Sequence, residues 1–345
     1  MVGIVPLLVV GCDGDSTGYA LRRGLESFTG SAVDDDALSE VRGSAFGVKG
    51  EARPMVGTGM DQSDILKHVR AAVVRDVQPV GNTSVVFRLL LKGRVDAAFK
   101  PRQRSKPIGF RSEIAAYRLA RVLGLDNVPP VISRRLTKES LFGKLGEDDR
   151  ASVQDLESEI LWEGPPGQEW VTGASIYWVP DMKDLGIDSA SRMRRWTRHL
   201  QHDGVISASE VTWHQDLSTM LVFDYLIGNI DRFSGANVQG TEDGERLFAR
   251  DHDLAFPPKF RTSRHQVVLD HLTRTQKFSR SLVDRLEATT EDQIRDELDL
   301  DPYADEEPLL SDEQIGALMD RREAVLSYVQ ALVDEYGEDR VLVFD

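Results

Sequence analysis

The feature that most constrains this fold is a helix-like stretch that ends in a polar loop near residue 230. Apolar residues recur at helical spacing between 217 and 227. Gly228 and Asn229 then interrupt the pattern, as residues at the end of a helix do. Asp231 and Asn237 follow on a short loop. The stretch therefore predicts a helix that delivers an acid and an amide to one loop.

A second acidic loop, 250–256, follows the short apolar run 247–249. An acid and an amide on one loop, and then an acid after a strand, is the layout of a kinase catalytic loop and its metal-binding aspartate. In that layout Asp231 orients or deprotonates the acceptor hydroxyl, while Asn237 and Asp251 hold metal ions on the nucleotide phosphates. The alternative is a turn in which Asp231 and Asn237 cap helices or form Asx-turns.

Length and charge limit the classes of protein and partner. The chain has 345 residues, which suits one large two-lobed domain or two domains. Its net charge of -15 argues against nucleic acid or anionic lipid as the main partner. The acidic run 287–307 is expected to be a solvated surface or a loop.

The amino-terminal stretch has the features of a lipoprotein signal. Residues 2–10 are apolar and precede Cys12, the single cysteine, which excludes an intramolecular disulfide. Residues 9–12 resemble a bacterial lipobox, although no Lys or Arg precedes them. We expect a signal over 1–12, a flexible linker over 13–60 and a lipid anchor at Cys12 in the cell envelope. The alternative is a start upstream or a buried first strand, the latter in a cytoplasmic protein.

A β-hairpin is predicted between residues 85 and 101, with a turn at 92–93. Lys100 closes its second or third strand, where it is either a site residue or an exposed strand-end lysine. The turn before the hairpin can lie over phosphates because its backbone amides are unobstructed, or it is simply a hairpin turn. The predicted phosphate-contacting residues of this turn are Gly81, Asn82, Thr83 and Ser84.

A helix is predicted from Ser112, its expected N-cap, to the stop at Gly124. Glu113 lies in its first turn, where the helix dipole alone favours an acid. A polar, irregular insertion is expected over 138–170. The next buried strand, 174–179, suits the hinge between two lobes, with Trp178 and Val179 as its adenine-contacting residues.

The second half of the chain is predicted to be mostly helical. The expected helices are 189–201, 214–228, 263–286 with interruptions, and 311–336. Arg192, Arg194, Arg195 and Arg198 either dock an acidic substrate or form a solvated helix face. The seven histidines show no metal-ligand spacing.

Taken together, these elements follow the order of a bilobal kinase. The order is hairpin, Lys100, helix with Glu113, hinge strand, then helices that enclose the loops of Asp231 and Asp251. We therefore predict an α+β fold with a small β-rich N-lobe over 61–182 and a helical C-lobe over 183–345.

The chain resembles the atypical kinases of the secretory pathway, the Golgi casein kinase type, and their bacterial relatives. More distantly it is similar to the phosphoinositide kinases and the HipA-type kinases. The blocks that carry the resemblance are 98–101, 112–131, 224–238 and 251–256.

The resemblance implies a role for each matching residue. Lys100 would contact the nucleotide phosphates, and Glu113 would position Lys100 or the metal. Asp231 would be the catalytic acid-base residue. Asp251, aided by Asn237, would bind Mg²⁺ or Mn²⁺.

The sequence departs from the family pattern in three places. Phe233 stands where many relatives have His after the Asp-Arg pair, and the spacing from Asp231 to Asn237 is one residue longer than in typical protein kinases. Where relatives often have Asp-Asn-Gly, this chain has Asp-His-Asp at 251–253, which leaves Asp253 as a fallback or second metal ligand.

The expected function is an ATP-dependent kinase that transfers the γ-phosphate to a hydroxyl acceptor. The favoured acceptor is a protein Ser or Thr, and a sugar hydroxyl or a lipid headgroup also fits. The alternative is an inactive, lipid-tethered pseudokinase that serves as a binding or scaffold module. Phosphoryl transfer needs positioning and charge neutralisation, so a site without a covalent nucleophile is sufficient.

Overall fold

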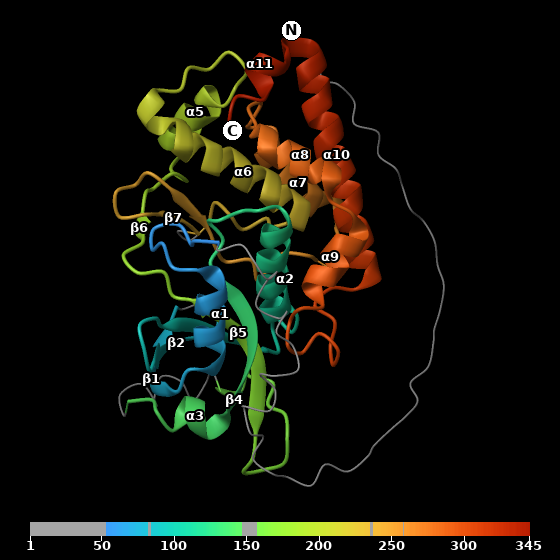
Figure 1. The fold of residues 1–345 in the computed structure, drawn as a ribbon. Helices are drawn as coiled ribbons and strands as arrows, with labels where there is room; N and C mark the ends of the chain where they lie inside the picture. Colours follow the sequence, from blue (N-terminus) through green and yellow to red (C-terminus); the bar gives the residue numbers. More distant parts are fainter. Residues whose placement is uncertain (1–52, 82–83, 147–156, 235–236, 258) are drawn as a thin grey trace. The chain divides into compact units, whose positions relative to one another are not determined.

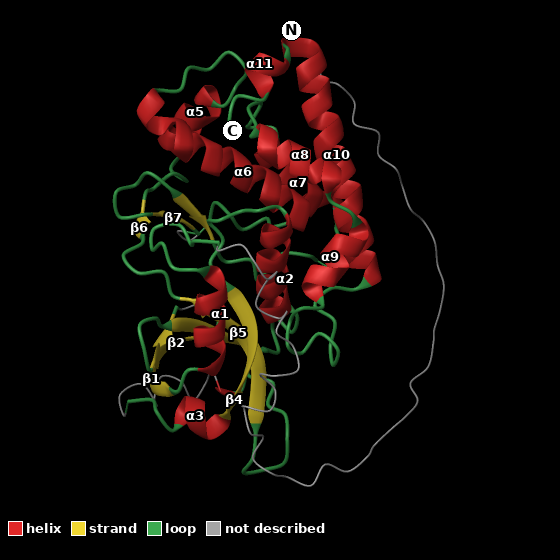
Figure 2. Ribbon diagram, viewed as in Figure 1, coloured by secondary structure: helices red, strands yellow, loops and turns green. Residues whose placement is uncertain are grey.

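A five-stranded antiparallel sheet organises the first half of the described chain (Figures 1 and 2). The computed structural model describes residues 53–81, 84–146, 157–234, 237–257 and 259–345, all within the compact unit Arg42–Asp345. The strand order is β1-β2-β3-β5-β4. The strands are β1 (Val74–Val80), β2 (Val86–Leu91), β3 (Ala97–Pro101), β4 (Val131–Thr137) and β5 (Trp170–Tyr177).

Two helices cover opposite faces of this sheet. Ser175 on β5 donates its hydroxyl to the Val69 carbonyl of α1 (Gln62–Ala71) at 2.8 Å. Lys100 lies opposite Ala174 in the β3–β5 register and reaches α2 (Gly109–Val122) instead. Because adjacent strand residues point to opposite faces, α1 and α2 lie on different sides of the sheet.

The N-lobe departs from the predicted elements at three points. The helical spacing of Ile65, Val69 and Val73 predicts a short helix over 64–74, but α1 ends at Ala71 and β1 begins at Val74. Helix α2 begins at Gly109, so Ser112 is not its N-cap; the Ser112 hydroxyl donates to the Ala255 carbonyl at 2.9 Å. Within the predicted insertion 138–170, the described part includes α3 (Lys138–Phe142).

The linker boundary predicted at residue 60 is also wrong. Pro54 and Asp61 form a β-bridge, and Met55 is buried in the core. The chain before α1 is therefore packed from residue 53 onward. The predicted signal and the rest of the predicted linker lie outside the described residues.

The C-lobe is built around α6 (Val211–Ile227), which is buried along most of its length. Gly228 ends it in the left-handed conformation, with φ 67°, as the sequence predicted. A Cβ at Gly228 would lie 2.8 Å from the Phe260 ring, so only glycine fits here. The other described helices are α5 (Ala190–His199), α7 (Thr262–Leu272), α8 (Arg280–Ala288), α9 (Glu291–Leu298), α10 (Asp312–Tyr336), α11 (Glu338–Val341) and the 3₁₀ turn η1 (Ala208–Glu210).

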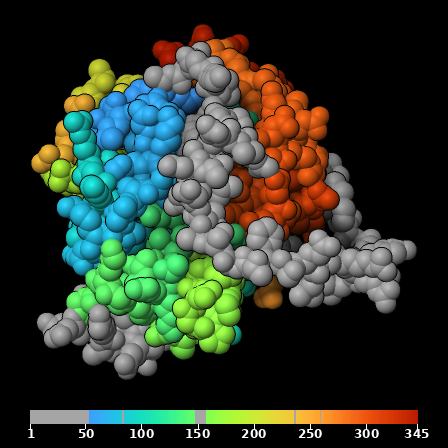
Figure 3. All heavy atoms as spheres, turned by 60° about the horizontal axis from the view of Figure 1, so that its bottom comes forward, coloured from blue at the N-terminus to red at the C-terminus, as the bar shows by residue number. Residues whose placement is uncertain are grey.

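The acidic run 287–307 was expected to be a solvated surface or a loop, and it is mostly a solvated surface that includes a helix. It contains α9, whose Ile294 is buried, and the Glu297 carboxylate pairs with Arg118 and Arg121 of α2. This run therefore joins the C-lobe to α2. Figure 3 shows the N-lobe surface, blue to yellow-green, and the orange surface of the C-terminal helices on the same face of the molecule.

A small second sheet carries the loops of the predicted site. Its strands are β6 (Lys183–Asp184), β7 (Val238–Gly240) and β8 (Leu247–Ala249), in the order β6-β7-β8. The loop with Asp231 precedes β7, and Asp251 follows β8. The predicted α+β architecture, with a β-rich N-lobe and a helical C-lobe, is confirmed.

Candidate active site

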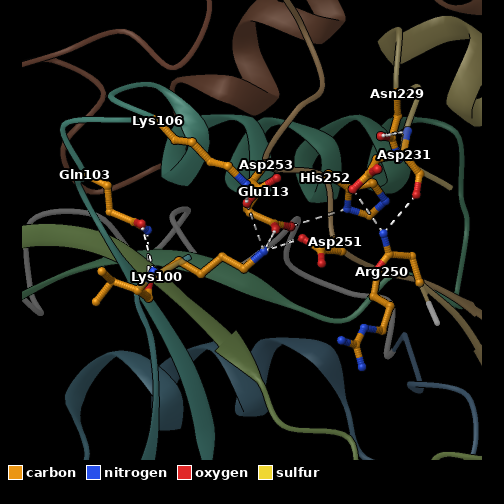
Figure 4. Close-up of polar contacts among 12 residues, drawn as sticks. Lys100, Gln103, Lys106, Glu113, Asn229, Asp231, Arg250, Asp251, His252 and Asp253 are labelled. Atoms are coloured by element: carbon orange, nitrogen blue, oxygen red, sulfur yellow. Dashed lines mark hydrogen bonds and ion pairs between the residues drawn. The ribbon is translucent and has the colours of Figure 1, made fainter. Parts of the chain in front are cut away.

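Lys100 lies at the centre of the site. It is 8% exposed, which excludes the strand-end alternative. Its Nζ lies 2.5 Å from Oε1 of Glu113 and 2.5 Å from Oδ1 of Asp251 (Figure 4). Glu113 belongs to α2, and Asp251 follows β8. One ammonium group therefore joins the sheet, helix α2 and the C-lobe.

The Asp-His-Asp segment of the C-lobe, residues 251–253, adds Asp253 and His252 to this cluster. Oδ2 of Asp253 lies 3.8 Å from Nζ of Lys100. His252 is buried, and its Nδ1 lies 3.5 Å from Oε2 of Glu113. Asp251 has φ 62°, a conformation that Asp tolerates better than most residues. Strained backbone of this kind is common where a side chain must be aimed at a site.

The opposite charges of Lys100 and Glu113 stabilise each other's ionised form. Burial alone would lower the pKa of Lys100, but the carboxylates of Glu113, Asp251 and Asp253 outweigh burial and raise it. Burial would raise the pKa of Glu113, but Lys100 and His252 lower it well below its usual range. Asp253 behaves differently, because burial raises its pKa. Lys100 and Glu113 therefore stay charged at neutral pH.

Asp231 lies on the loop after α6, held by neighbours of that loop. Its backbone N–H donates to Oδ1 of Asn229 at 3.2 Å. The Asn237 amide donates to the Asp231 carbonyl at 2.9 Å and to its Oδ2 at 3.3 Å. The Ser234 hydroxyl donates to Oδ1 of Asp231. The structure thus joins Asn237 to Asp231, and metal binding by Asn237 stays a prediction.

A buried ion pair fixes this loop to α6. The Arg232 guanidinium donates to both carboxylate oxygens of Asp224, at 2.7 and 2.8 Å, and neither side chain is more than 1% exposed. Arg232 also donates to the carbonyls of Asn237 and Arg250. Burial opposes its charge, but Asp224 outweighs burial and raises the Arg232 pKa. The Asp-Arg motif was visible in the sequence, but this positioning role was not predicted.

The predicted phosphate-contacting turn connects β1 to β2. Gly81 has φ 81°, and Ser84 is half-buried, whereas Asn82 and Thr83 lie outside the described residues. Gln103 holds the end of the turn: its Oε1 accepts the Val85 N–H at 2.9 Å, and its Nε2 donates to the Val85 carbonyl at 3.0 Å. Gln103 was not predicted, because nothing in its sequence surroundings marks this contact.

The predicted hinge residues follow β5. The Trp178 N–H donates to the Asp96 carbonyl at 3.1 Å, and the Arg88 guanidinium lies 4.6 Å from the centroid of the Trp178 ring. Val179 is buried. Their contact with adenine stays a prediction.

Lys106, between β3 and α2, forms an ion pair with the acidic cluster, with its Nζ 2.8 Å from Oδ2 of Asp253. Arg102 and Arg111 pair with Glu307 instead. In the sequence these cations share the polar stretch that follows Lys100, which does not separate them. The contact of Lys106 with Asp253 was not predicted, because it depends on how the loop between β3 and α2 folds back.

The acidic cluster suits a hard divalent cation. Glu113, Asp251 and Asp253 bring three carboxylates around Lys100. Mg²⁺ and Mn²⁺ prefer carboxylate oxygens. Asp251 and Asp253 could hold such an ion: Asp251 meets Lys100 through Oδ1 and Asp253 meets Lys106 through Oδ2, whereas both oxygens of Glu113 face Lys100 and His252. Bound there, the ion would neutralise phosphate charge.

Comparison with known proteins places the chain among kinases by fold. It is 24% identical to human glycosaminoglycan xylosylkinase over 340 residues. The aligned region covers 86% of this chain and 79% of that protein. The structure of hydra Fam20 with sugar matches with a TM-score of 0.64 and 18% identity, over 86% of this chain and 96% of that one. The structure of the Golgi casein kinase with Mn/ADP bound matches with a TM-score of 0.58 and 18% identity, over 81% of this chain and 78% of that one. The predicted kinase-like fold is confirmed.

The family described as the Four-jointed box protein middle domain matches residues 89–271. This range begins in β2 and ends in α7, and it contains Lys100, Glu113, Asp231 and Asp251. The match spans more than half of the chain. The protein belongs to the Four-jointed box protein middle domain family.

Proposed function

We propose that this protein is an ATP-dependent phosphotransferase that transfers the γ-phosphoryl group of ATP to a hydroxyl acceptor, with Mg²⁺ or Mn²⁺ as cofactor. One observation carries the proposal: the buried Lys100 ammonium lies between Glu113 of α2 and Asp251 after β8. Phosphate binding requires a fixed cation next to carboxylates that hold a metal ion, and this geometry supplies both. The relatives named above include kinases of a sugar and of a protein.

Each residue has a defined task in this reaction. Lys100 has three N–H donors, two of which are engaged by Glu113 and Asp251, so the third is free for a phosphate oxygen. Glu113 keeps Lys100 oriented. The acceptor oxygen bonds to the γ-phosphorus as the bond from that phosphorus to the β–γ bridging oxygen breaks and ADP leaves. Asp231 accepts the proton of the acceptor hydroxyl, and Asn237 holds the Asp231 carboxylate in place. The bound cation supplies charge neutralisation at the phosphates.

The first test measures nucleotide binding. The melting temperature of the purified protein should rise with ATP and Mn²⁺ together, because ligands that bind only the folded state stabilise it. Lys100→Met should remove this rise while leaving the metal-free protein folded. Wild-type protein whose melting temperature does not respond to ATP with Mg²⁺ or Mn²⁺ would contradict the proposal. A protein that binds nucleotide but transfers no phosphate to any acceptor would be a scaffold.

The acceptor class needs a direct comparison. We propose a protein Ser or Thr hydroxyl, as the sequence favoured. The glycosaminoglycan xylosylkinase relative makes a sugar hydroxyl the competing acceptor. Label from γ-labelled ATP should be followed into casein and into a xylose-containing oligosaccharide under identical conditions. Label found only in the oligosaccharide would show that the acceptor is a sugar hydroxyl and not a protein hydroxyl.

Location is a separate proposal that rests on sequence alone. We propose that a lipid on Cys12 anchors the protein to a bacterial cell envelope, with the cytoplasm as the alternative. No helix in the described part of the chain combines the length and the apolar character needed to cross a membrane. Cys12→Ala should move the protein from the membrane fraction to the soluble fraction. Wild-type protein already in the soluble cytoplasmic fraction would contradict the anchor.

A further inference from the structure

A second cluster of metal-ligating side chains lies in the C-lobe, on elements that the proposed reaction does not use. His199 is the last residue of α5, Glu210 ends η1, and His214 lies in the first turns of α6. Nδ1 of His199 lies 3.1 Å from Nε2 of His214. One ligand atom from each of the three residues lies within 4.8 Å of the others.

The ring of His214 is set in the orientation of a metal ligand. Its Nδ1 lies 2.7 Å from the Glu210 carbonyl, so Nδ1 carries the proton and donates it. Nε2 therefore keeps its lone pair and points at His199. A carbonyl on the far ring nitrogen is the usual outer contact of a metal-bound histidine, because it fixes the tautomer. His214 is 2% exposed, so the ring has little freedom to turn away.

We propose that His199, Glu210 and His214 bind a borderline divalent cation, for which Zn²⁺ is the best fit. Two imidazoles and one carboxylate are a recognised zinc ligand set. Two nitrogens at zinc distance and a tetrahedral angle lie about 3.3 Å apart. The 3.1 Å between the two histidine nitrogens is close to this value. The Glu210 carboxylate, whose ligand atom lies within 4.8 Å of those of both histidines, would move closer to them as the third ligand.

The carboxylate of Glu210 is already oriented by its neighbours. Arg195 lies 3.0 Å from its Oε1, and the Ser207 hydroxyl donates to its Oε2 at 3.0 Å. Each carboxylate oxygen has a second lone pair, so these contacts leave Glu210 able to bind a cation. Glu210 and His214 are also four residues apart at the start of a helix, which places both on one face.

The cluster borders a cavity of about 410 Å³. Asp243 and Glu245, in the turn between β7 and β8, line the same cavity, as do Arg192 and Arg195, so its lining carries charges of both signs. A tetrahedral ion held by three protein ligands keeps one open position. The cavity gives that position room for water or for a further ligand.

The simplest competing explanation is a hydrogen bond between two neutral histidines. In that case Nδ1–H of His199 donates to Nε2 of His214, and no ion is involved. Burial lowers the pKa of His214, which keeps the ring neutral and is compatible with both explanations. A measurement of metal binding distinguishes a cation site from a hydrogen bond between the two histidines.

The proposed ion would join α5 to the start of α6. Trp196 of α5 stacks on Phe233 with ring centroids 5.7 Å apart, and Phe233 is two residues after Asp231. A cation that fixes the end of α5 would therefore also steady the residues that pack against the catalytic loop. We assign it a structural role. No local sequence pattern predicted this site, because His199 is 15 residues from His214.

The test is a Zn²⁺ titration of the untagged full chain in excess Mg²⁺, which occupies the oxygen-ligand site. All variants carry Cys12→Ser, so that no thiol competes for zinc. His199→Gln is the main variant because His199 is half-buried and less critical for folding. We expect saturable zinc binding in the parent and a loss of affinity on the order of 100-fold or more in His199→Gln and His214→Gln. His265→Gln, on α7, is the matched control and should bind like the parent.

Binding of Co²⁺ provides an independent readout, because a tetrahedral nitrogen-oxygen site gives visible absorption bands. The bands should form in the parent and be absent in His199→Gln. Equal zinc affinity of the parent and His199→Gln would overturn the proposal and leave a histidine hydrogen bond. Loss of binding in Asp251→Asn but not in His199→Gln would place the ion at the acidic cluster and would overturn it too.

Discussion

Lys100 and Asp251 lie 151 residues apart in the sequence, yet Nζ of Lys100 is 2.5 Å from Oδ1 of Asp251. The contact joins β3 of the N-lobe to the loop after β8 in the C-lobe. It places a cation that can bind phosphate beside a carboxylate that can bind metal. Nucleotide and cation binding should therefore depend on each other.

Asp251→Asn tests this coupling. Asn has nearly the size of Asp and tolerates the same positive φ, so the fold should persist. The loss of charge should remove most of the tightening of ADP binding by Mn²⁺, at least about tenfold. Calorimetric titration of ADP with and without Mn²⁺ measures this. Asp292→Asn, an exposed change on α9, is the control. Unchanged Mn²⁺ dependence in Asp251→Asn would remove Asp251 from the metal site.

Glu113→Gln tests the buried pair with Lys100. Removal of one partner leaves a buried charge less well compensated, so the free energy of unfolding should fall by ~3–5 kcal/mol at pH 7. Urea unfolding measures the change. Glu313→Gln, in the exposed first turn of α10, should stay within about 0.5 kcal/mol of wild type.

The same comparison has a pH dependence of defined sign. The folded-state pKa of Glu113 lies below its ordinary value of 4.5. Its stabilising contribution is therefore fully present above that value and is lost as the pH falls toward the folded-state pKa. The stability gap between wild type and Glu113→Gln should stay constant near neutrality and shrink below about pH 4.5. A gap that widens in acid would contradict the assignment.

Arg232 variants test how the catalytic loop is held. Arg232→Met leaves Asp224 buried without its partner and should cost ~3–5 kcal/mol of unfolding free energy. Arg232→Lys keeps the charge but loses the two parallel hydrogen bonds, so its cost should be intermediate. Thermal and urea unfolding of both variants measure the difference. A stability for Arg232→Met within about 1 kcal/mol of wild type would show that the pair is not needed.

Lys106→Met tests whether this lysine contributes to nucleotide binding. Its ammonium lies 2.8 Å from Asp253, at the edge of the acidic cluster. We expect the KM for ATP to rise about tenfold with kcat largely kept, as for a contact made equally in the ground and transition states. Arg104→Met is the matched control, because Arg104 donates to the Ser158 carbonyl instead. Equal KM values for the two variants would exclude Lys106 from the site.

Much of the fold could be predicted from periodicity and from glycine. The hairpin, the central helix and its stop at Gly228 lie where the sequence placed them. Strand β1 was missed because it is the edge strand and contains Pro79, which an edge strand tolerates but a strand pattern does not suggest. Helix α9 was not predicted because its sequence is mostly charged, and only two of its residues, Ile294 and Leu298, are buried and apolar.

The site was predictable only in part, for a similar reason. Lys100, Glu113 and Asp251 are spread over 151 residues, and motif order alone indicated that they meet. The contacts of Gln103 and Lys106 follow no local pattern, since they depend on how the loop between β3 and α2 folds back. Their roles needed the tertiary structure.

The most direct test of the proposed function compares wild type with Asp231→Asn in one experiment. Both proteins receive γ-labelled ATP, Mn²⁺ and acceptor, and nucleotide affinity and phosphate transfer are measured in parallel. In the proposed reaction Asp231 acts on the acceptor hydroxyl, so Asp231→Asn should bind ADP with nearly wild-type affinity and transfer phosphate about 10²–10⁴-fold more slowly. Transfer by Asp231→Asn at the wild-type rate, or no transfer by the wild type, would contradict the account.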